Sequence, residues 1–247
     1  MIPLCRPVFG AREREYVEEC LATGWVVTGR FVEAFEAALS ARFDGAHVVT
    51  VNSGTTALTL ALRAVGVREG TCVLLPALTF RATENAIRAC GARPVHLDVD
   101  EAWTLDPQAV RHTLWHGLHD RPVGAVVPVH LHGVPATMAC APDIVPVPFV
   151  GPTAREVIWP PIVEDAAGAL GSAPVGLAGT AILSFNANKI VTAAGGGAVV
   201  THDARIAEAV RRMSRHVRDG DDARGDANLL LTNLQAAVGL AQIETLD

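Results

Sequence analysis

The feature that most constrains the fold of this chain is a regular alternation of short apolar segments with longer amphipathic ones. The apolar segments 47–51, 72–80 and 180–185 have the length and the branched side chains of buried β-strands. The segments 31–43 and 57–65 instead place apolar residues at helical spacing. Strands that alternate with helices predict an α/β fold, in which a mostly parallel sheet is covered by helices on both faces.

Two segments depart from this alternation. The segment 135–161 is rich in proline, which forbids a long helix, so we expect an extended loop where the pattern would place a crossover helix. The segment 219–226 is charged and glycine-containing, and we expect it to be a second loop. The remaining expected elements are helices at 11–24, 82–91, 104–114 and 203–220, a final helix that begins within 227–247, and strands at 92–100, 124–133, 162–167 and 198–201.

The composition limits the kinds of protein that this chain can be. Half of the residues are hydrophobic and 19% are charged, so the 247 residues can form one large α/β domain, or two small ones. The net charge of −6 argues against nucleic acid as a partner. The five cysteines are scattered without CxxC spacing, which argues against a disulfide framework or structural zinc. No signal peptide or membrane-spanning run is evident, so we expect a cytoplasmic protein.

Three residues in the second half of the chain suggest a cofactor site. Lys189 is the only lysine among twenty Lys and Arg residues, and it lies between two apolar segments. A surface lysine at a strand end is the alternative reading. However, Asp165 ends one predicted strand and Ser184 lies in the strand that leads to the lysine. A pyridoxal phosphate (PLP) site needs an amine for the imine, an acid for the ring nitrogen and a hydroxyl for the phosphate.

Two earlier segments could contribute to the same site. The turn 53–55 (Ser-Gly-Thr) opens a helix, and such a turn presents backbone N–H groups and hydroxyls that suit a phosphate, although it can also be a plain N-cap. Phe80 stands where a strand gives way to a helix, and it is either a core aromatic or a side chain that leans over a ligand. Ligands of α/β sheets bind at the carboxyl ends of the strands, where all these residues are expected.

Other kinds of site have little support in the sequence. His130 and His132 alternate as they would in a strand, so their side chains should face opposite ways. No third ligand lies near them, and we expect no metal site. No GxGxxG follows a predicted strand, so a dinucleotide-binding domain is poorly supported.

Taken in order, several segments resemble the DegT/StrS-type sugar aminotransferases, which are PLP enzymes of the aspartate aminotransferase fold (fold type I). The motif SFNANK with its trailing glycines is most similar to the branch that aminates C4 of nucleotide-linked keto sugars. The matching segments span almost the whole chain: TGWVVTGRFVEAFE, VNSGTTALTLAL, LPALTFRATENAI, GARPVHLDVD, PVHLHG, VEDAAGALGS, LSFNANKIVTAAGGGAVVT and NLLLTNLQAAVGLAQIE.

The resemblance implies roles at the matching positions. Lys189 would form the imine with the cofactor and later move a proton between the cofactor's C4′ and the substrate carbon. Asp165 would pair with the pyridinium nitrogen, and Phe80 would stack on the ring. A lysine at 189 favours transamination over the family's dehydratase branch, which has histidine there.

The remaining implied roles concern the phosphate and a second subunit. Gly54, Thr55 and Ser184 would hold the phosphate. Asn228 would reach the phosphate in the neighbouring subunit, which requires a homodimer with sites at the interface. The substrates would be an amino-acid donor, such as glutamate, and a nucleotide-linked keto sugar.

The chain also departs from the family pattern. Gly168 stands where the family has Gln, Glu or His near the phenolic oxygen of the cofactor, and Leu230 stands where it has arginine. The resemblance makes residues 1–247 the PLP-binding large domain, with an N-terminal arm at 1–30, and the family's small C-terminal domain is absent. The alternative hypothesis is therefore a fragment or a truncated member, weak or inactive, that binds PLP or pairs with a full-length partner.

Overall fold

The computed structural model describes residues 2, 5–118, 120–137, 160–215 and 228–246. Its strands form two hydrogen-bonded groups, in the orders β3-β2-β4 and β5-β6-β7-β1. Single parallel bridges from Val126 to Ile162 and from Val129 to Asp165 join β4 to β5, so the two groups form one continuous surface. The strands are β1 (His47–Val51), β2 (Cys72–Pro76), β3 (Arg93–Leu97), β4 (Val123–Val126), β5 (Glu164–Asp165), β6 (Thr180–Ser184) and β7 (Gly197–Thr201).

The predicted mostly parallel sheet is confirmed, with one strand reversed. The pairs β2–β3, β2–β4 and β5–β6 are parallel, whereas β7 is antiparallel to both β6 and β1. The reversal fits the connection, because residues 185–196 join β6 to β7 as a loop without a crossover helix and return the chain from the same edge of the sheet. This loop therefore lies at the carboxyl end of β6, where the sequence places Lys189.

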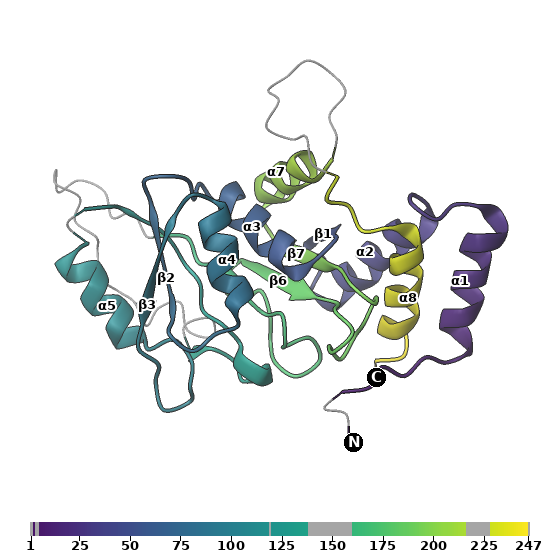
Figure 1. Ribbon diagram of the computed structural model, residues 1–247, viewed down its shortest axis with the longest axis horizontal. Helices are drawn as coiled ribbons and strands as arrows, with labels where there is room; N and C mark the ends of the chain where they lie inside the picture. Colours follow the sequence, from purple (N-terminus) through teal and green to yellow (C-terminus); the bar gives the residue numbers. More distant parts are fainter. Residues whose placement is uncertain (1, 3–4, 119, 138–159, 216–227, 247) are drawn as a thin grey trace, which may run out of the picture.

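Helices cover both faces of the sheet, as predicted (Figure 1). On one face Val49 and Val73 pack in a cluster with side chains of α3 and α7, and on the other Val48 packs with α2 and α8. A third cluster lies around Leu74 and side chains of α5. The helices are α1 (Ala11–Thr23), α2 (Arg30–Arg42), α3 (Gly54–Ala64), α4 (Arg81–Ala89), α5 (Pro107–His116), α7 (Ala204–Ser214) and α8 (Asn233–Ile243).

The sequence signals for helix ends were informative. Gly24 ends α1 with φ of 75°, a backbone conformation that glycine adopts without steric cost. Asp106 caps α5 through Gln108 N–H, and Thr232 forms a capping box with Gln235 at α8. None of the described helices is long and apolar enough to cross a membrane.

Four expected strands are several residues shorter than predicted. Those expected at 72–80, 92–100 and 162–167 are β2, β3 and β5, and the strand expected at 124–133 ends at Val126. Pro128 follows, and proline cannot donate a ladder hydrogen bond. The chain then enters a short 3₁₀ turn, Leu131–Gly133, so the strand-like alternation of His130 and His132 was misread. The two side chains nevertheless differ as expected, because His130 is buried and His132 is exposed. Most of the expected loop 135–161 and all of the loop 219–226 lie outside the described residues.

Helices α2 and α8 pack closely against each other. A Cβ built on Gly239 in α8 would lie 2.7 Å from Cζ of Phe35 in α2. Phe35 cannot move away easily, because it is fully buried and its ring packs 5.0 Å from that of Phe185. The absence of a side chain at Gly239 therefore sets the distance between these helices.

We predict that Gly239→Val lowers the free energy of unfolding by about 2 kcal/mol, because the added methyl groups overpack a rigid contact. Urea denaturation followed by circular dichroism measures the loss. Glu208→Val, at an exposed position of α7, is the matched control and should change stability by less than about 1 kcal/mol. Equal losses in both variants would contradict the argument.

Candidate active site

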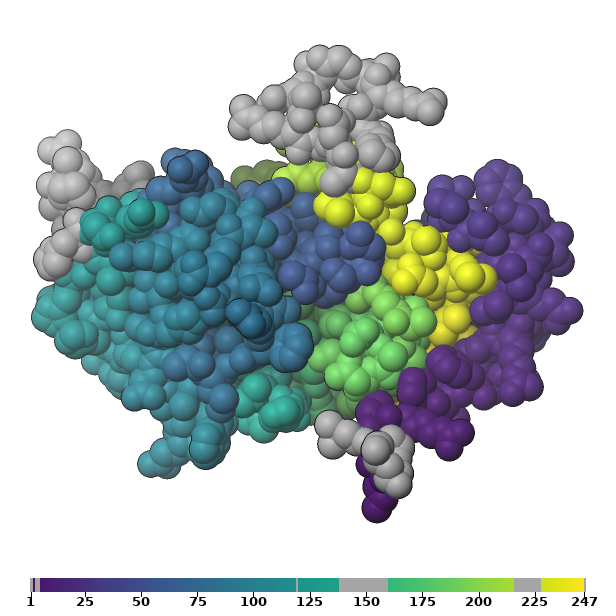
Figure 2. All heavy atoms as spheres, in the orientation of Figure 1, coloured from purple at the N-terminus to yellow at the C-terminus, as the bar shows by residue number. Residues whose placement is uncertain are grey.

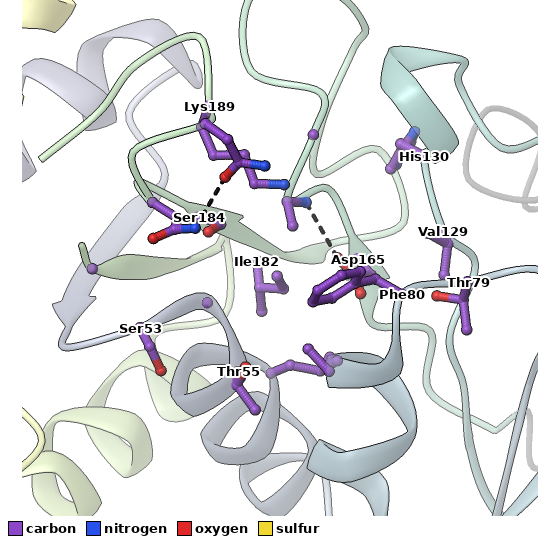
Figure 3. Close-up of a pocket in the computed structure, with 18 of the residues that line it drawn as sticks. Ser53, Thr55, Thr79, Phe80, Val129, His130, Asp165, Ile182, Ser184 and Lys189 are labelled. Carbon is purple, nitrogen blue, oxygen red and sulfur yellow. Dashed lines mark hydrogen bonds between the residues drawn. The ribbon is translucent and has the colours of Figure 1, made fainter. Parts of the chain in front are cut away.

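A cavity of about 630 Å³ opens at the carboxyl edge of the sheet (Figure 3). Its walls come from the first turn of α3, the start of α4, the ends of β5 and β6, and the loop that follows β6. In Figure 3, Lys189 and Ser184 lie on one side of the cavity, and Thr79, Val129 and His130 lie on the other. Figure 2 shows the green β6–β7 segment reaching the surface between the blue α3–α4 region and yellow α8.

Lys189 is held by the loop that reverses the chain between β6 and β7. Phe185 N–H donates to Gly196 O and Ala193 N–H donates to Phe185 O, both at 2.9 Å, which closes the loop at its base. Within the loop, Lys189 N–H donates to Asn186 O at 2.9 Å. The Lys189 side chain is half-buried, and its amine makes no hydrogen bond or ion pair with the described residues.

Asp165 ends β5 with its carboxyl group buried beside the cavity. Thr83 Oγ1 donates to Oδ2 at 2.8 Å and Ala167 N–H donates to Oδ1 at 3.2 Å. Burial raises the pKa of Asp165, and the two hydrogen bonds and the more distant Lys189 charge offset this only in part. The carboxylate therefore lacks a direct cationic partner among the described residues, and a ligand cation would relieve the cost of ionising it.

The start of α3 forms an anion-binding turn. Ser53 Oγ caps the helix by accepting from Thr56 N–H at 3.0 Å, and the N–H groups of the first turn have no partner within the helix. The hydroxyls of Thr55 and Ser184 face the cavity without a hydrogen bond to any described residue. These groups match what a phosphate requires.

Two glycines allow this turn to approach the sheet. A Cβ on Gly54 would lie 2.9 Å from Ser184 Cβ, and a Cβ on Gly197 would lie 2.6 Å from Gly54 N. Both contacts are shorter than real Cβ atoms permit. Glycine at 54 and 197 thus brings the helix N-terminus and the end of β6 together.

Phe80 immediately precedes α4, and its side chain lines the cavity while remaining 79% exposed. An aromatic ring so poorly covered by protein is not a core residue, which decides between the two readings of its position. Its exposed face suits a planar ring as a stacking partner.

The structure brings together six of the seven predicted site residues and leaves out Asn228. Gly54, Thr55, Phe80, Asp165, Ser184 and Lys189 all line the cavity. Asn228 is exposed and does not line it. It precedes Leu229, whose carbonyl accepts from Asn52 N–H, and Leu230, which forms a bridge with Val51.

The sequence analysis missed two interactions that support the site. The first is the hydrogen bond from Thr83 to Asp165, which joins residues far apart in sequence. The second is a fully buried pair, in which Glu164 accepts from His130 Nε2 at 3.2 Å and also from the N–H groups of Gly176 and Ala178. His130 Nδ1 accepts from Ala136 N–H, so the ring is neutral with its proton on Nε2. The adjacent residues Glu164 and Asp165 at a predicted strand end were the sequence signal for such buried acid contacts, but the signal was ambiguous.

This combination of a fold type I sheet with a lysine, a buried acid, an exposed aromatic ring and an open helix N-terminus defines the PLP-dependent transferase class. The residues fit the cofactor in its charge and its phosphate. The buried carboxyl of Asp165, which has no cationic partner in direct contact among the described residues, suits the ring nitrogen, and the first turn of α3 suits the phosphate.

The chain belongs to the DegT/DnrJ/EryC1/StrS aminotransferase family, whose model matches residues 7–247. It is 35% identical to the GDP-perosamine synthase of Caulobacter vibrioides, over the whole of this chain and 65% of that protein. The sugar aminotransferase CalS13 from Micromonospora echinospora has a similar structure, with a TM-score of 0.84, 30% identity, and coverage of 100% of this chain and 69% of that one. The PLP form of Spr1654 from Streptococcus pneumoniae matches with a TM-score of 0.82, 25% identity, and coverage of 98% and 66%.

These findings confirm the family, the fold type and PLP as the cofactor of the family. The chain spans less than two thirds of the length of the Caulobacter relative. The roles of individual site residues remain predictions.

We predict that Asp165→Asn stabilises the cofactor-free chain at neutral pH. Because burial raises the pKa of Asp165, the folded state binds its proton more tightly than the unfolded state, where the carboxyl ionises near 3.8. The stability that this proton contributes is therefore fully present below the unfolded pKa of 3.8, and it is lost as the pH rises through the folded pKa. An amide of the same shape carries no such penalty.

Urea denaturation of the cofactor-free protein at neutral pH and near pH 4 tests this expectation. The advantage of Asp165→Asn should shrink at the lower pH. Asp98→Asn, at an exposed position, is the control and should change stability by less than about 0.5 kcal/mol. A variant that is less stable at neutral pH would show that the buried carboxylate is compensated within the protein.

Proposed function

We propose that this protein is a PLP-dependent transaminase that moves an amino group from an amino acid to the keto group of a nucleotide-linked sugar. The observation that carries the proposal is the single cavity in which the only lysine meets Asp165, Phe80 and the first turn of α3. The bound cofactor supplies an electron sink and accepts the amino group in transit.

The residues of the chain have distinct tasks in this proposal. Lys189 Nζ holds the cofactor and, once released by the substrate, carries a proton to and from the substrate carbon. Asp165 remains ionised beside the protonated ring nitrogen and keeps the ring electron-withdrawing. Gly54, Thr55 and Ser184 bind the phosphate, and Phe80 restricts the tilt of the ring.

The choice of substrate rests on the relatives. The Caulobacter relative is a GDP-perosamine synthase, and CalS13 is a sugar aminotransferase. Both names support an amino-sugar product, and the first supports a nucleotide-linked one. Glutamate is our proposed donor. The free thiols of Cys5, Cys20, Cys72 and Cys90 suit the reducing conditions of the cytoplasm, which is the proposed location.

We predict that borohydride reduction of the PLP-loaded protein attaches the cofactor at Lys189. The chain has no other lysine, so peptide mass spectrometry gives an unambiguous answer once the N-terminal amine is checked. Lys189→Arg is the matched variant, because it keeps a positive charge but cannot form the imine, and it should lose the label and the turnover of keto sugar. Retained turnover in that variant would refute the proposal.

A second candidate is a cofactor-binding protein without turnover, either alone or beside a full-length partner. Gly168 and Leu230 favour it. Glutamate distinguishes the two functions. If the visible absorbance of the lysine-bound cofactor disappears when glutamate is added, the chain completes the first half of the transamination; if it persists, the second function is correct.

We also propose a homodimer in which Asn228 acts on the cofactor phosphate of the other subunit. Its exposure and its absence from its own cavity support this arrangement. We predict that mixing Lys189→Ala and Asn228→Ala chains, after exchange of subunits, gives more turnover than either variant alone, because one site of each mixed dimer then has both residues. No gain in confirmed mixed dimers would place Asn228 outside the site.

A further inference from the structure

One wall of the cavity has no side chain where it borders Asp165. Gly168 lines this wall, and a Cβ built on it would meet only His130 O, at 3.9 Å. Gly168 directly follows Ala167, whose N–H donates to Asp165. Room therefore remains beside the ring-nitrogen site for a group from another segment.

The turn Leu131–Gly133 occupies the space next to Gly168. A Cβ built on Gly133 would lie 3.6 Å from Gly168 O and 2.5 Å from Ser172 Oγ, so the turn packs directly against the segment 168–172. His132 belongs to this turn and lines the cavity. His130, two residues earlier, holds the turn in place through its buried hydrogen bonds with Glu164 and Ala136.

His132 has an unusual backbone conformation and a side chain without a hydrogen-bond partner among the described residues. Its φ of 52° and ψ of 29° lie in the left-handed region, which costs a residue other than glycine about 1 kcal/mol and is concentrated at functional sites. The side chain is exposed and makes no hydrogen bond or ion pair within the part of the chain that the structure describes. Of the two cavity histidines, His130 has both ring nitrogens engaged, whereas His132 has both available.

We propose that His132 is a ligand-contacting residue that takes the place of the side chain missing at Gly168 and donates a hydrogen bond to an oxygen of the bound ligand. The inference rests on the proposed function. The other titratable groups that line the cavity are Lys189, Asp165 and His130. Asp165 and His130 have no free hydrogen-bond donor to offer at this wall. Lys189 has one, but the proposed function assigns it to the cofactor.

The shape of the cofactor indicates which oxygen is in reach. The phosphate-bearing arm and the phenolic oxygen lie on opposite sides of the line from the ring nitrogen to the aldehyde carbon. Figure 3 shows His130, whose carbonyl oxygen borders Gly168, on the far side of the cavity from Ser53 and Thr55. With the phosphate at the first turn of α3, the phenolic oxygen faces the wall of His132. A carboxylate or hydroxyl of the substrate is the other source of such an oxygen.

The test compares His132→Gly with His132→Asn. Glycine removes the side chain and accepts the left-handed backbone, so the free energy of unfolding should not fall, and asparagine keeps a donor in a conformation that it tolerates. His112→Gly would alter a helix, so His112→Ala is the control; His112 is an exposed residue of α5 whose ring packs against that of His116, and it does not line the cavity. The readout is the pH midpoint of the visible absorbance of the lysine-bound cofactor.

A contact with the phenolic oxygen predicts that His132→Gly raises this midpoint by about one pH unit, because a lost donor leaves more negative charge to hold the nearby proton. His132→Asn should shift it less, His112→Ala should not shift it, and Gly168→Gln added to His132→Gly should restore it. If the midpoint is unchanged but several-fold more glutamate is needed to remove the absorbance, His132 contacts the substrate instead.

The outcomes separate this inference from the proposed function. Absorbance that forms normally, with both readouts unchanged in His132→Gly, overturns the role of His132 alone. An unaltered protein that forms no such absorbance with PLP overturns the proposed function, and the inference with it.

Discussion

The cost of burying the carboxyl group of Asp165 is the constraint on which the site depends. The residue ends a strand of only two residues, and β6 and the single bridges from β4 fix its backbone between them. Two hydrogen bonds satisfy its oxygens, yet burial keeps its pKa raised, because these bonds and the more distant Lys189 charge offset the burial only in part. The fold thus contains a carboxylate that the protein itself stabilises only in part and that a cationic ring can stabilise further. The same burial that lowers the stability of the cofactor-free protein therefore favours binding of such a ring.

The reversed strand β7 gives this carboxylate its chemical partner. If β6 were followed by a crossover helix, the chain would leave the carboxyl edge, as it does after β2, where α4 follows. Because residues 185–196 turn back at that edge instead, Lys189 faces the cavity that Asp165 borders. The same turn brings Gly197 against the start of α3, so the first turn of α3 and the lysine are positioned by a single connection.

Much of this arrangement could be predicted from the sequence, since the alternation of strands and helices fixes the carboxyl edge as the site. Lys189 was found because it is the only lysine and lies between two apolar segments, and Asp165 and Ser184 were found because they lie in or at the end of predicted strands. The support of Asp165 by Thr83 and the pairing of Glu164 with His130 could not be found, because they join segments whose spatial neighbours are set only by strand order. The brevity of β4 and the turn at His132 were missed because proline at 128 breaks the ladder without changing the apolar pattern. The role proposed for Asn228 would depend on a second chain, so its contacts within one chain cannot test it.

The single lysine also limits which side chains of the protein can react with pyridoxal phosphate. Pyridoxal phosphate is a reactive aldehyde, and it condenses with accessible amines on most protein surfaces. Arginine provides the other nineteen of the twenty basic side chains, and a guanidinium does not form such an imine readily. The surface therefore keeps its solvating cations without offering aldehydes a second side-chain amine. Among the side chains, reaction with the aldehyde is thereby directed to Lys189, and an excess of cofactor leaves the other cationic side chains unaltered.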